Sequence, residues 1–465
     1  MPTKSGSLTR RACLLGGAAL PGLRAAAPRP NILWILAEDM SPQLACYGEP
    51  LIRTPNLDRM ASQGARFQNA FTTAPVCSAS RSAIITGMYQ TAIGSHNHRT
   101  IDKKPLPEGT RLVTDRLREA GYFTVLSSRG PGKQKGLSGP AGSGKTDFNF
   151  VAPKPFDGYD WSQRPAGKPF FAQLSIAESH KGGGWPLARK LTPRIDQSKL
   201  QLPPYWPDHP IARDEYANYL EAIQLVDNYV GDILKRLERE GILDNTLVFF
   251  MGDNGSCTFR GKQFLYEGGI RVPLIVRWPG HVKPGSAPEG LVSSIDMTAA
   301  SLAAAGVEIP RNFHGRDFLA PDDPGRPRIF AARDRCDIAT ERMRCVRDAR
   351  YKYIRNFLPA IPYMQSNPYK EAQYPTWNLV KKLKAEGKLT PAQLLFAAES
   401  KPVEELYDLQ ADPHEIRNLA GETSHKERLL AMRGQLDEWI RQTGDRGEIM
   451  EDPVAIYESY FGKKA

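Results

Sequence analysis

Three apolar runs in this chain end abruptly in polar residues, and no other feature constrains the fold so strongly. These runs are Asn31–Ala37, Phe170–Ile176 and Leu247–Met251. Continuous apolar runs of this length are typical of strands that are buried on both faces of a parallel sheet. Glu38 and Asp39 follow the first run, and Asp253 and Asn254 follow the third after one glycine. Because ligands of such sheets bind beyond the carboxyl ends of the strands, we expect these polar groups to converge at one edge.

Segments with helical signals separate these runs. Thr54 is a candidate N-cap before Pro55, and it would place Leu57, Met60 and Ala61 on one helix face. Further helices are predicted at Arg81–Tyr89, Asp115–Ala120, Tyr216–Glu240 and Ser294–Ala305. Strands that alternate with helices predict an α/β fold, in which helices cover both faces of a mostly parallel sheet.

A change in composition near residues 322–327 is typical of a linker. A chain of 465 residues exceeds what one hydrophobic core usually serves, so two unequal domains are expected. We predict a larger domain at residues 28–325 and a smaller α+β domain at residues 326–465. The smaller domain should contain an antiparallel hairpin that turns at Asp348-Ala349. Helices are also expected there at Thr376–Lys384 and Ser424–Thr443.

The first 27 residues resemble an export signal. Arg10 and Arg11 form a twin-arginine pair before a short apolar run, and Ala25–Ala27 offer small residues for cleavage. The apolar run is too short for a stable membrane span, and no other segment is typical of one. We therefore expect an exported protein, periplasmic or extracellular. The formal net charge of +11 favours anionic partners, but no long block of basic residues indicates nucleic acid.

The six cysteines do not form a disulfide framework or a zinc site by their spacing. Cys13 lies in the leader, and the other five are scattered. Cys336 and Cys345 either pair across a hairpin or remain unpaired as small core residues.

One local motif indicates chemistry. It is P-V-C-S-A-S-R-S-A-I-I-T-G, which contains Cys77, Ala79 and Arg81. It resembles the sulfatase signature, in which a cysteine or serine is oxidised to formylglycine, with Ala79 in place of the commoner proline. The resemblance continues in order through P-N-I-L-W-I, T-P-N-L-D, Y-E-G-G-I-R-V-P-L-I-V-R-W-P-G, R-Y-K-Y-I-R-N-F and E-E-L-Y-D-L. It implies an alkaline-phosphatase-like fold with a small C-terminal sheet domain, and sulfuric ester hydrolase activity.

The resemblance also implies a nucleophile made by a formylglycine-generating enzyme. A hydrated aldehyde has two hydroxyls, so one can attack sulfur and the other, once deprotonated, can expel sulfate. Four residues match the metal ligands of the family: Glu38, Asp39, Asp253 and Asn254, with Glu38 replacing the usual first aspartate. Oxygen ligands of this kind suit Ca²⁺, with Mg²⁺ as the alternative.

Further family positions carry groups that can contact sulfate. Arg81 can hydrogen-bond the hydrate, Lys262 matches a sulfate-binding lysine, and His180 matches a histidine near the leaving oxygen. G-K-T-D-F-N-F makes Lys145 the second sulfate lysine, and Lys133 is its rival. Many sulfatases have Lys-x-His at this point, whereas this chain has Asp147, which leaves open how the hydrate is activated.

Two other motifs are weaker. Residues 139–146 match the phosphate-loop pattern, but neither flank offers the required strand or helix, so we interpret the match as accidental. His96 and His98 have H-x-H spacing without further soft ligands, and are expected to be rim contacts to substrate or plain surface residues.

The predicted substrate is a sulfated carbohydrate outside the cell. Three loops combine aromatic, basic and amide groups that suit sugars: Ser95–Arg99, Lys181–Trp185 and Asn356–Asn367. Three alternatives remain: a phosphate or phosphonate ester hydrolase of the same superfamily, a non-catalytic glycan-binding relative, and a nucleotide-binding protein. Cys77 in C-S-A-S-R favours the sulfatase over the first alternative. The presence of Cys77, Arg81, Lys145, His180 and Lys262 with the four metal ligands argues against the second, and a lack of nucleotide binding would exclude the third.

Overall fold

The structure is a computed structural model that describes residues 1–3, 29–128 and 144–462. The export signal predicted for residues 1–27 lies outside that part except for its first three residues, and Lys133 lies outside it as well. In the part that is described, no helix is both long and apolar enough to cross a membrane.

A seven-stranded sheet forms the centre of the described structure. Its strands are β1 (Asn31–Ala37), β2 (Ala65–Phe71), β3 (Phe123–Ser128), β4 (Phe170–Ile176), β5 (Thr246–Gly252), β6 (Arg271–Arg277) and β7 (Leu291–Ser293). They lie in the order β3-β4-β1-β5-β6-β2-β7. Only β6 pairs antiparallel with its two neighbours; the other pairs are parallel. The prediction of a mostly parallel sheet is confirmed.

The register of the central strands brings three carboxyl ends to one level. Ala37, the last residue of β1, pairs with Ile176 of β4 on one side and with Gly252 of β5 on the other. The polar residues that follow these strands therefore start from adjacent positions at the same edge, as the sequence predicts.

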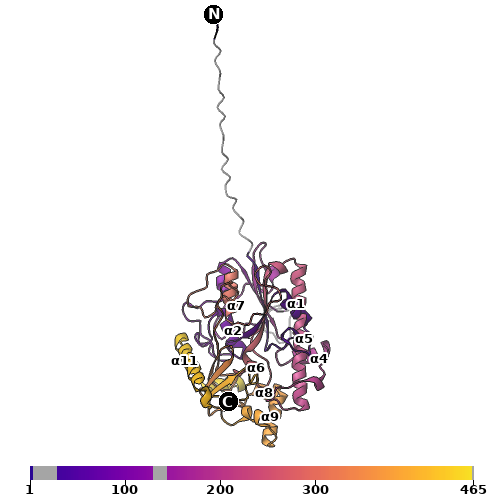
Figure 1. The fold of residues 1–465 in the computed structure, drawn as a ribbon, viewed down its shortest axis with the longest axis vertical. Helices are drawn as coiled ribbons and strands as arrows, with labels where there is room; N and C mark the ends of the chain where they lie inside the picture. The colour runs from indigo at the N-terminus through magenta and orange to yellow at the C-terminus, as the bar shows by residue number, and fades with distance from the viewer. Residues whose placement is uncertain (4–28, 129–143, 463–465) are drawn as a thin grey trace.

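Helices cover both faces of this sheet, and β1 shows why. Ile32, Trp34 and Leu36 pack with residues of α2 (Cys77–Thr86), α3 (Val113–Glu119) and α7 (Asp296–Ala304). Leu33 and Ile35 pack on the other face with residues of α1 (Pro55–Gln63) and α5 (Pro210–Arg239). Both sets are apolar because both faces of the strand are buried. Figure 1 shows α2 and α7 on one side of the sheet, and α1, α4 and α5 on the other.

Seven helices lie in this part of the described structure, and the sequence predicted all of them except the fourth and the sixth. They are α1 (Pro55–Gln63), α2 (Cys77–Thr86), α3 (Val113–Glu119), α4 (Gly184–Leu191), α5 (Pro210–Arg239), α6 (Glu267–Ile270) and α7 (Asp296–Ala304). The helix expected at Arg81–Tyr89 begins at Cys77 and ends before Gly87, whose φ of 68° is left-handed. The helix expected from Tyr216 begins at Pro210, because the His209 side chain caps it by accepting from the Ile211 N–H.

The C-terminal part contains the predicted antiparallel sheet. Its strands are β8 (Ile329–Arg333), β9 (Met343–Arg347), β10 (Tyr351–Asn356) and β11 (Glu404–Asp408), in the order β11-β10-β9-β8. β9 and β10 form the hairpin expected at Asp348-Ala349. Helices α8 (Pro368–Gln373), α9 (Pro375–Ala385), α10 (Pro391–Ala397), α11 (Lys426–Thr443) and α12 (Pro453–Phe461) complete it. Short 3-10 helices lie at Ala45–Tyr47, Trp161–Gln163, Gln197–Lys199, Leu243–Asn245 and Thr423–His425.

The two parts of the chain share a buried interior. Ile329 and Met343 belong to the same apolar cluster as Leu33 of β1. The ammonium of Lys352 on β10 is buried and lies 2.7 Å from a carboxylate oxygen of Glu267 on α6. The division at residues 325 and 326 stays a prediction.

The cysteine alternatives are resolved within the described residues. Cys336 and Cys345 are both free and buried, so the pairing across a hairpin does not form. Cys345 packs in the large apolar cluster, whereas Cys336 packs with Ala74, Val76 and Ala79 beside the start of α2.

Candidate active site

The ends of β1 and β5 place four oxygen-bearing side chains together. The Asp39 backbone N–H donates to Asp253 Oδ1 at 3.0 Å, and Asn254 Nδ2 donates to Asp39 Oδ1 at 2.9 Å. Asp39 has a left-handed φ of 53°, an uncommon conformation for an aspartate. Glu38, Asp39, Asp253 and Asn254 are all nearly or fully buried.

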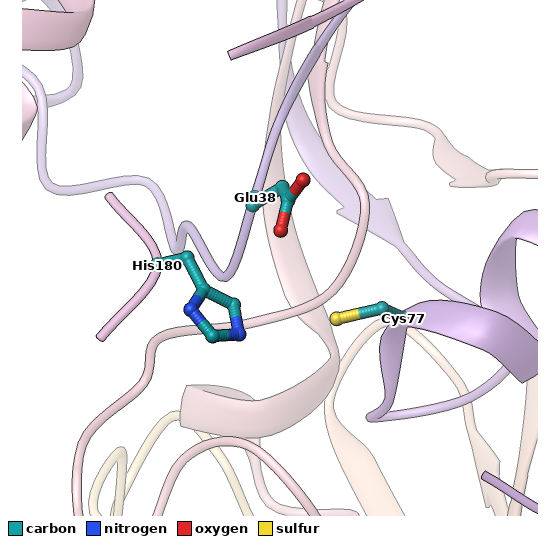
Figure 2. Close-up of side chains that lie close together, drawn as sticks. All are labelled: Glu38, Cys77 and His180. Atoms are coloured by element: carbon teal, nitrogen blue, oxygen red, sulfur yellow. The ribbon is translucent and has the colours of Figure 1, made fainter. Parts of the chain in front are cut away.

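Cys77 is the first residue of α2 and lies at the centre of this group. Its Sγ is 3.4 Å from Asp39 Oδ1 and 3.2 Å from Lys262 Nζ. The ligand atoms of Glu38, Cys77 and His180 lie within 4.8 Å of one another, as do those of Asp39, Cys77 and Asp253. Figure 2 shows the side chains of Glu38, Cys77 and His180 pointing toward one another from separate segments.

Three cations near Cys77 contact the three carboxylates. Arg81, one turn further along α2, donates from Nε to Asp253 Oδ2 at 2.8 Å. Lys262 Nζ lies 2.9 Å from Asp39 Oδ2, and Lys145 Nζ lies 2.9 Å from Glu38 Oε2. Each carboxylate therefore has its own cationic partner.

His180 borders the same space from the more open side. Its Nε2 lies 3.6 Å from Asp39 Oδ2, and its Nδ1 lies 2.9 Å from the Lys181 carbonyl oxygen. Because a carbonyl only accepts, Nδ1 carries the proton, so Nε2 is the ring nitrogen that faces the site. About a quarter of the His180 side chain is exposed (26%), whereas Arg81 and Lys262 are almost fully buried.

Burial and neighbouring charges set the protonation of these groups. Burial opposes ionisation of Asp39 most strongly, yet Lys262 and His180 lower its pKa below the usual value. Burial raises the pKa of Asp253, and repulsion from Glu38 and Asp39 adds to this against the attraction of Arg81. Burial, helped by Lys262, lowers the pKa of His180 to about 4.

The four oxygen-bearing residues fit a hard divalent cation. Glu38 Oε1 and Asn254 Oδ1 are buried and have no hydrogen-bond partner among the described residues. A buried oxygen without a partner is costly, and a cation would satisfy both. It would also relieve the repulsion among Glu38, Asp39 and Asp253 that raises the pKa of Asp253.

Two loop residues complete the surroundings: Asp147, which the sequence analysis noted beside Lys145, and Arg99, the last residue of the loop 95–99. The carboxylate of Asp147 lies 3.4 Å from Lys145 Nζ on one side and 3.4 Å from Arg99 Nε on the other. Arg99 follows the two histidines in the chain, yet nothing in the sequence indicates that it meets Asp147.

The two histidines differ from their sequence-based interpretation. His96 and His98 are both buried, so the expectation of plain surface residues is wrong. His98 Nδ1 lies 3.3 Å from Asp337 Oδ1, and Cys336 lies close by. Asp337 also accepts from the Tyr460 hydroxyl at 2.9 Å. His98 and Asp337 are 239 positions apart in the sequence, which explains why no sequence signal predicts this contact.

The phosphate-loop match does not have the structure that the motif requires. Within the described residues, no helix follows Thr146, and the segment from 144 to 148 is irregular. Lys145 instead directs its ammonium to Glu38.

Three carboxylates, one amide and three cations surround Cys77 at the edge of the sheet, and such an arrangement can bind an anionic group. A family model described as Sulfatase matches residues 30–307, and one described as N-sulphoglucosamine sulphohydrolase, C-terminal, matches residues 255–364. The first match covers more than half of the chain. The chain therefore belongs to the sulfatase family, whose members are sulfuric ester hydrolases.

Individual relatives agree with this family. An ulvan-active sulfatase of Formosa agariphila is 31% identical over 478 residues, which cover 92% of this chain and 77% of that protein. A protein solved in complex with its substrate D-glucosamine-2-N,6-O-disulfate has a TM-score of 0.63 at 19% identity, covering 91% of this chain and 100% of that one. The phosphonate monoester hydrolase of Agrobacterium radiobacter has a TM-score of 0.63 at 17% identity, covering 89% and 96%. The two structural similarities show the shared fold alone.

Proposed function

We propose that this sulfatase removes sulfate from an extracellular sulfated carbohydrate, using formylglycine formed from Cys77 and a bound calcium ion. The observation that carries the proposal is the place of Cys77 between an acid and a cation. Its Sγ lies 3.4 Å from Asp39 Oδ1 and 3.2 Å from Lys262 Nζ. A nucleophile at this position would have metal-binding oxygens on one side and a fixed positive charge on the other.

The burial of Cys77 supports modification before folding is complete. Its side chain is fully buried at the start of α2, with Asp39 and Lys262 against it. A formylglycine-generating enzyme could reach this thiol only in an unfolded or partly folded chain. Once formed, the hydrated aldehyde supplies one hydroxyl for attack on sulfur and a second for release of sulfate.

Glu38, Asp39, Asp253 and Asn254 would hold the metal. Their donor set of three carboxylates and one amide oxygen suits Ca²⁺, with Mg²⁺ as the alternative. When bound, the ion supplies positive charge that offsets the negative charge of the sulfate oxygens.

The remaining residues position and neutralise the sulfate group. Lys262 and Lys145 present ammonium groups on either side of the carboxylates, and Arg81 fixes Asp253 by its 2.8 Å contact. His180 reaches the same space from the more exposed side, where the alcohol of the ester must leave. Nδ1 of His180 donates a hydrogen bond to the Lys181 carbonyl oxygen, so Nε2 is the ring nitrogen that would face the leaving oxygen of the ester.

The substrate and the compartment rest on other observations. The twin-arginine-like leader favours export, and residues 28–465 keep a formal charge of +7, which favours encounter with polyanions. The ulvan-active relative from Formosa agariphila supports a sulfated polysaccharide as the substrate class.

Two measurements test the proposal. Mass spectrometry of active protein should show an aldehyde at Cys77, and full activity with an unmodified thiol would refute this role.

The matured enzyme should then be assayed on sulfated oligosaccharides, an aryl sulfate and an aryl phosphonate. Preference for a sulfated oligosaccharide is expected, because binding remote from the ester can be used at the reacting centre. Preference for the phosphonate would favour the alternative hydrolase.

A further inference from the structure

One cation near Cys77 has no role in the mechanism above. Arg99 lies in the loop that follows α2, and its backbone N–H donates to Ser78 Oγ at 2.8 Å. Ser78 is the neighbour of Cys77, so this bond ties Arg99 to the start of the nucleophile helix. From the other side, Arg335 Nη2 donates to the Arg99 carbonyl at 3.3 Å.

The backbone of Arg99 is held in an unusual conformation. Its φ of 53° is left-handed, and Asp147, which its side chain contacts, also has a left-handed φ of 52°. Such conformations are unfavourable for residues other than glycine and persist where surrounding contacts impose them, often at functional sites. Here they bring a guanidinium and a carboxylate together beside Lys145.

The guanidinium of Arg99 is only partly committed. Its single polar contact with a described residue is Nε to Asp147 Oδ1, which is long at 3.4 Å. Asp147 is also shared with Lys145, which lies 3.4 Å from its other oxygen. A guanidinium has five N–H donors, so the terminal nitrogens of Arg99 are left for another acceptor.

Exposure distinguishes Arg99 from the other cations of the site. Its side chain is 56% exposed, compared with 15% for Lys145, 3% for Lys262 and 1% for Arg81. The buried cations face the metal-binding carboxylates, whereas Arg99 faces solvent at the entrance. It is therefore placed for a part of the substrate that lies outside the reacting sulfate.

We propose that Arg99 selects the substrate by binding a second anionic group, a carboxylate or a sulfate, that lies on the sugar near the sulfate ester to be cleaved. This inference rests on the proposed function. A planar guanidinium pairs with either anion through two parallel N–H···O bonds, which gives direction as well as charge. Asp147 keeps the guanidinium at the entrance without using its terminal nitrogens.

The test compares Arg99→Gln, Arg99→Lys and wild type on three substrates. These are a sulfated disaccharide with a uronate carboxylate, a disulfated neutral disaccharide, and a monosulfated neutral disaccharide. Loss of a charge-assisted pair should lower kcat/KM by about 10- to 100-fold on a substrate with the second anion. On these substrates the loss should arise mainly from a higher KM, and Arg99→Lys should recover part of it. On the monosulfated disaccharide, kcat/KM should fall by less than about 3-fold. A larger loss on the substrate with the uronate would show that Arg99 binds a carboxylate, and a larger loss on the disulfated substrate would show that it binds a sulfate.

Arg111→Gln is the matched control, since Arg111 is an exposed arginine that is ion-paired with Glu119 away from the site. It should change none of the three values. Equal losses on all three substrates in Arg99→Gln would overturn the inference, because Arg99 would then only position Asp147 and Lys145. No loss on any of them would also overturn it. A wild-type enzyme that turns over no sulfate ester would instead refute the proposed function.

Discussion

The floor and the mouth of the site are built differently. The floor consists of Glu38, Asp39, Cys77, Arg81, Asp253, Asn254 and Lys262, whose side chains are at most 4% exposed. The mouth consists of Arg99, Lys145, Asp147 and His180, whose side chains are 13% to 56% exposed. The floor comes mainly from strand ends and one helix start, and the mouth from loops.

This difference in burial suggests which residues serve the chemical step and which ones serve substrate binding. A buried charge without a partner is very costly, so each floor group is held by a partner and its geometry is fixed. Arg81 and Asp253, for example, are both fully buried and lie 2.8 Å apart. At the mouth, the side chains are more exposed, and Asp147 lies 3.4 Å from both Lys145 and Arg99, so we expect changes at Asp147 and Arg99 to cost less. We therefore expect the chemical step to depend mainly on the floor, with Lys145 and His180 reaching it from the mouth, and the choice of substrate to depend on Arg99.

The largest expected effect comes from the floor. Asp253→Ala should lower kcat by at least about a thousand-fold, since it removes a proposed metal ligand and leaves the buried Arg81 without its carboxylate. Ca²⁺ should no longer raise the melting temperature of this variant, whereas it should stabilise the wild type. Steady-state kinetics measures the change in kcat. Calorimetry with and without a chelator measures the melting temperatures of wild type and variant.

The fold of that variant must be checked separately. Asp253→Asn keeps the shape of the side chain, so it should fold and still lose metal binding. Asp208→Ala is the control, because Asp208 is an exposed carboxylate that is paired with Arg213. An active enzyme after complete chelation would contradict the metal site.

The next effect separates the two lysines. Lys262 Nζ lies 3.2 Å from Cys77 Sγ and is 3% exposed, whereas Lys145 belongs to the mouth. Lys262→Ala should therefore cost about 10²- to 10³-fold in kcat, the range for a lost preorganised donor, and Lys145→Ala somewhat less. Steady-state kinetics on one aryl sulfate ranks them. If Lys133→Ala were more damaging than Lys145→Ala, the assignment of Lys145 would be wrong.

Much of the fold was predictable because the sheet is buried on both faces. The runs Asn31–Ala37 and Phe170–Ile176 match β1 and β4 residue for residue. The direction of β6 and the existence of β2 were not predicted. The sequence of β2, A-R-F-Q-N-A-F, mixes polar and apolar residues because this strand is only partly buried. A strand with that composition has no clear signal in the sequence.

The residues of the floor and most of those of the mouth were predictable, but the contacts among the mouth loops were not. Strand ends placed Glu38, Asp39, Asp253 and Asn254 together from elementary sheet geometry, and the structure agrees. The contacts of Arg99 with Asp147, and of His98 with Asp337, join loops that are far apart in the sequence. No periodicity or spacing predicts where such loops meet, because tertiary packing decides it.

A smaller effect is expected at the mouth from Asp147→Asn. Asp147 pairs with Lys145 and Arg99 at 3.4 Å each, and a partly exposed pair contributes about 0.2 to 1 kcal/mol. The kcat of this variant should therefore fall by no more than about 5-fold. Many sulfatases have histidine at this position, so a loss as large as that of Asp253→Ala would place Asp147 in the chemical step and break the division between floor and mouth.

The smallest effect on activity is expected behind the floor, at Lys370. Its ammonium is buried and donates to the carbonyls of Phe259 and Lys262 at 3.2 and 3.1 Å, among the rings of Phe264, Tyr374 and Trp377. It thereby supports the backbone of Lys262. Burial, with a contribution from Arg333, lowers the pKa of Lys370 to about 7.

This lowered pKa predicts how stability depends on pH. Between about pH 7 and pH 10 the unfolded chain binds one proton more at Lys370 than the folded chain, so this group makes folding more favourable as pH rises and less favourable as pH falls toward 7. The effect is at most about 1.4 kcal/mol per pH unit. Lys370→Met should remove it, so the difference in melting temperature between wild type and variant should change across this window. Lys381→Met, at an exposed lysine of α9 paired with Glu371, should leave the pH dependence as in wild type. A constant difference between wild type and Lys370→Met from pH 7 to 9 would show that Lys370 remains charged in the fold, held by its two carbonyls and three rings.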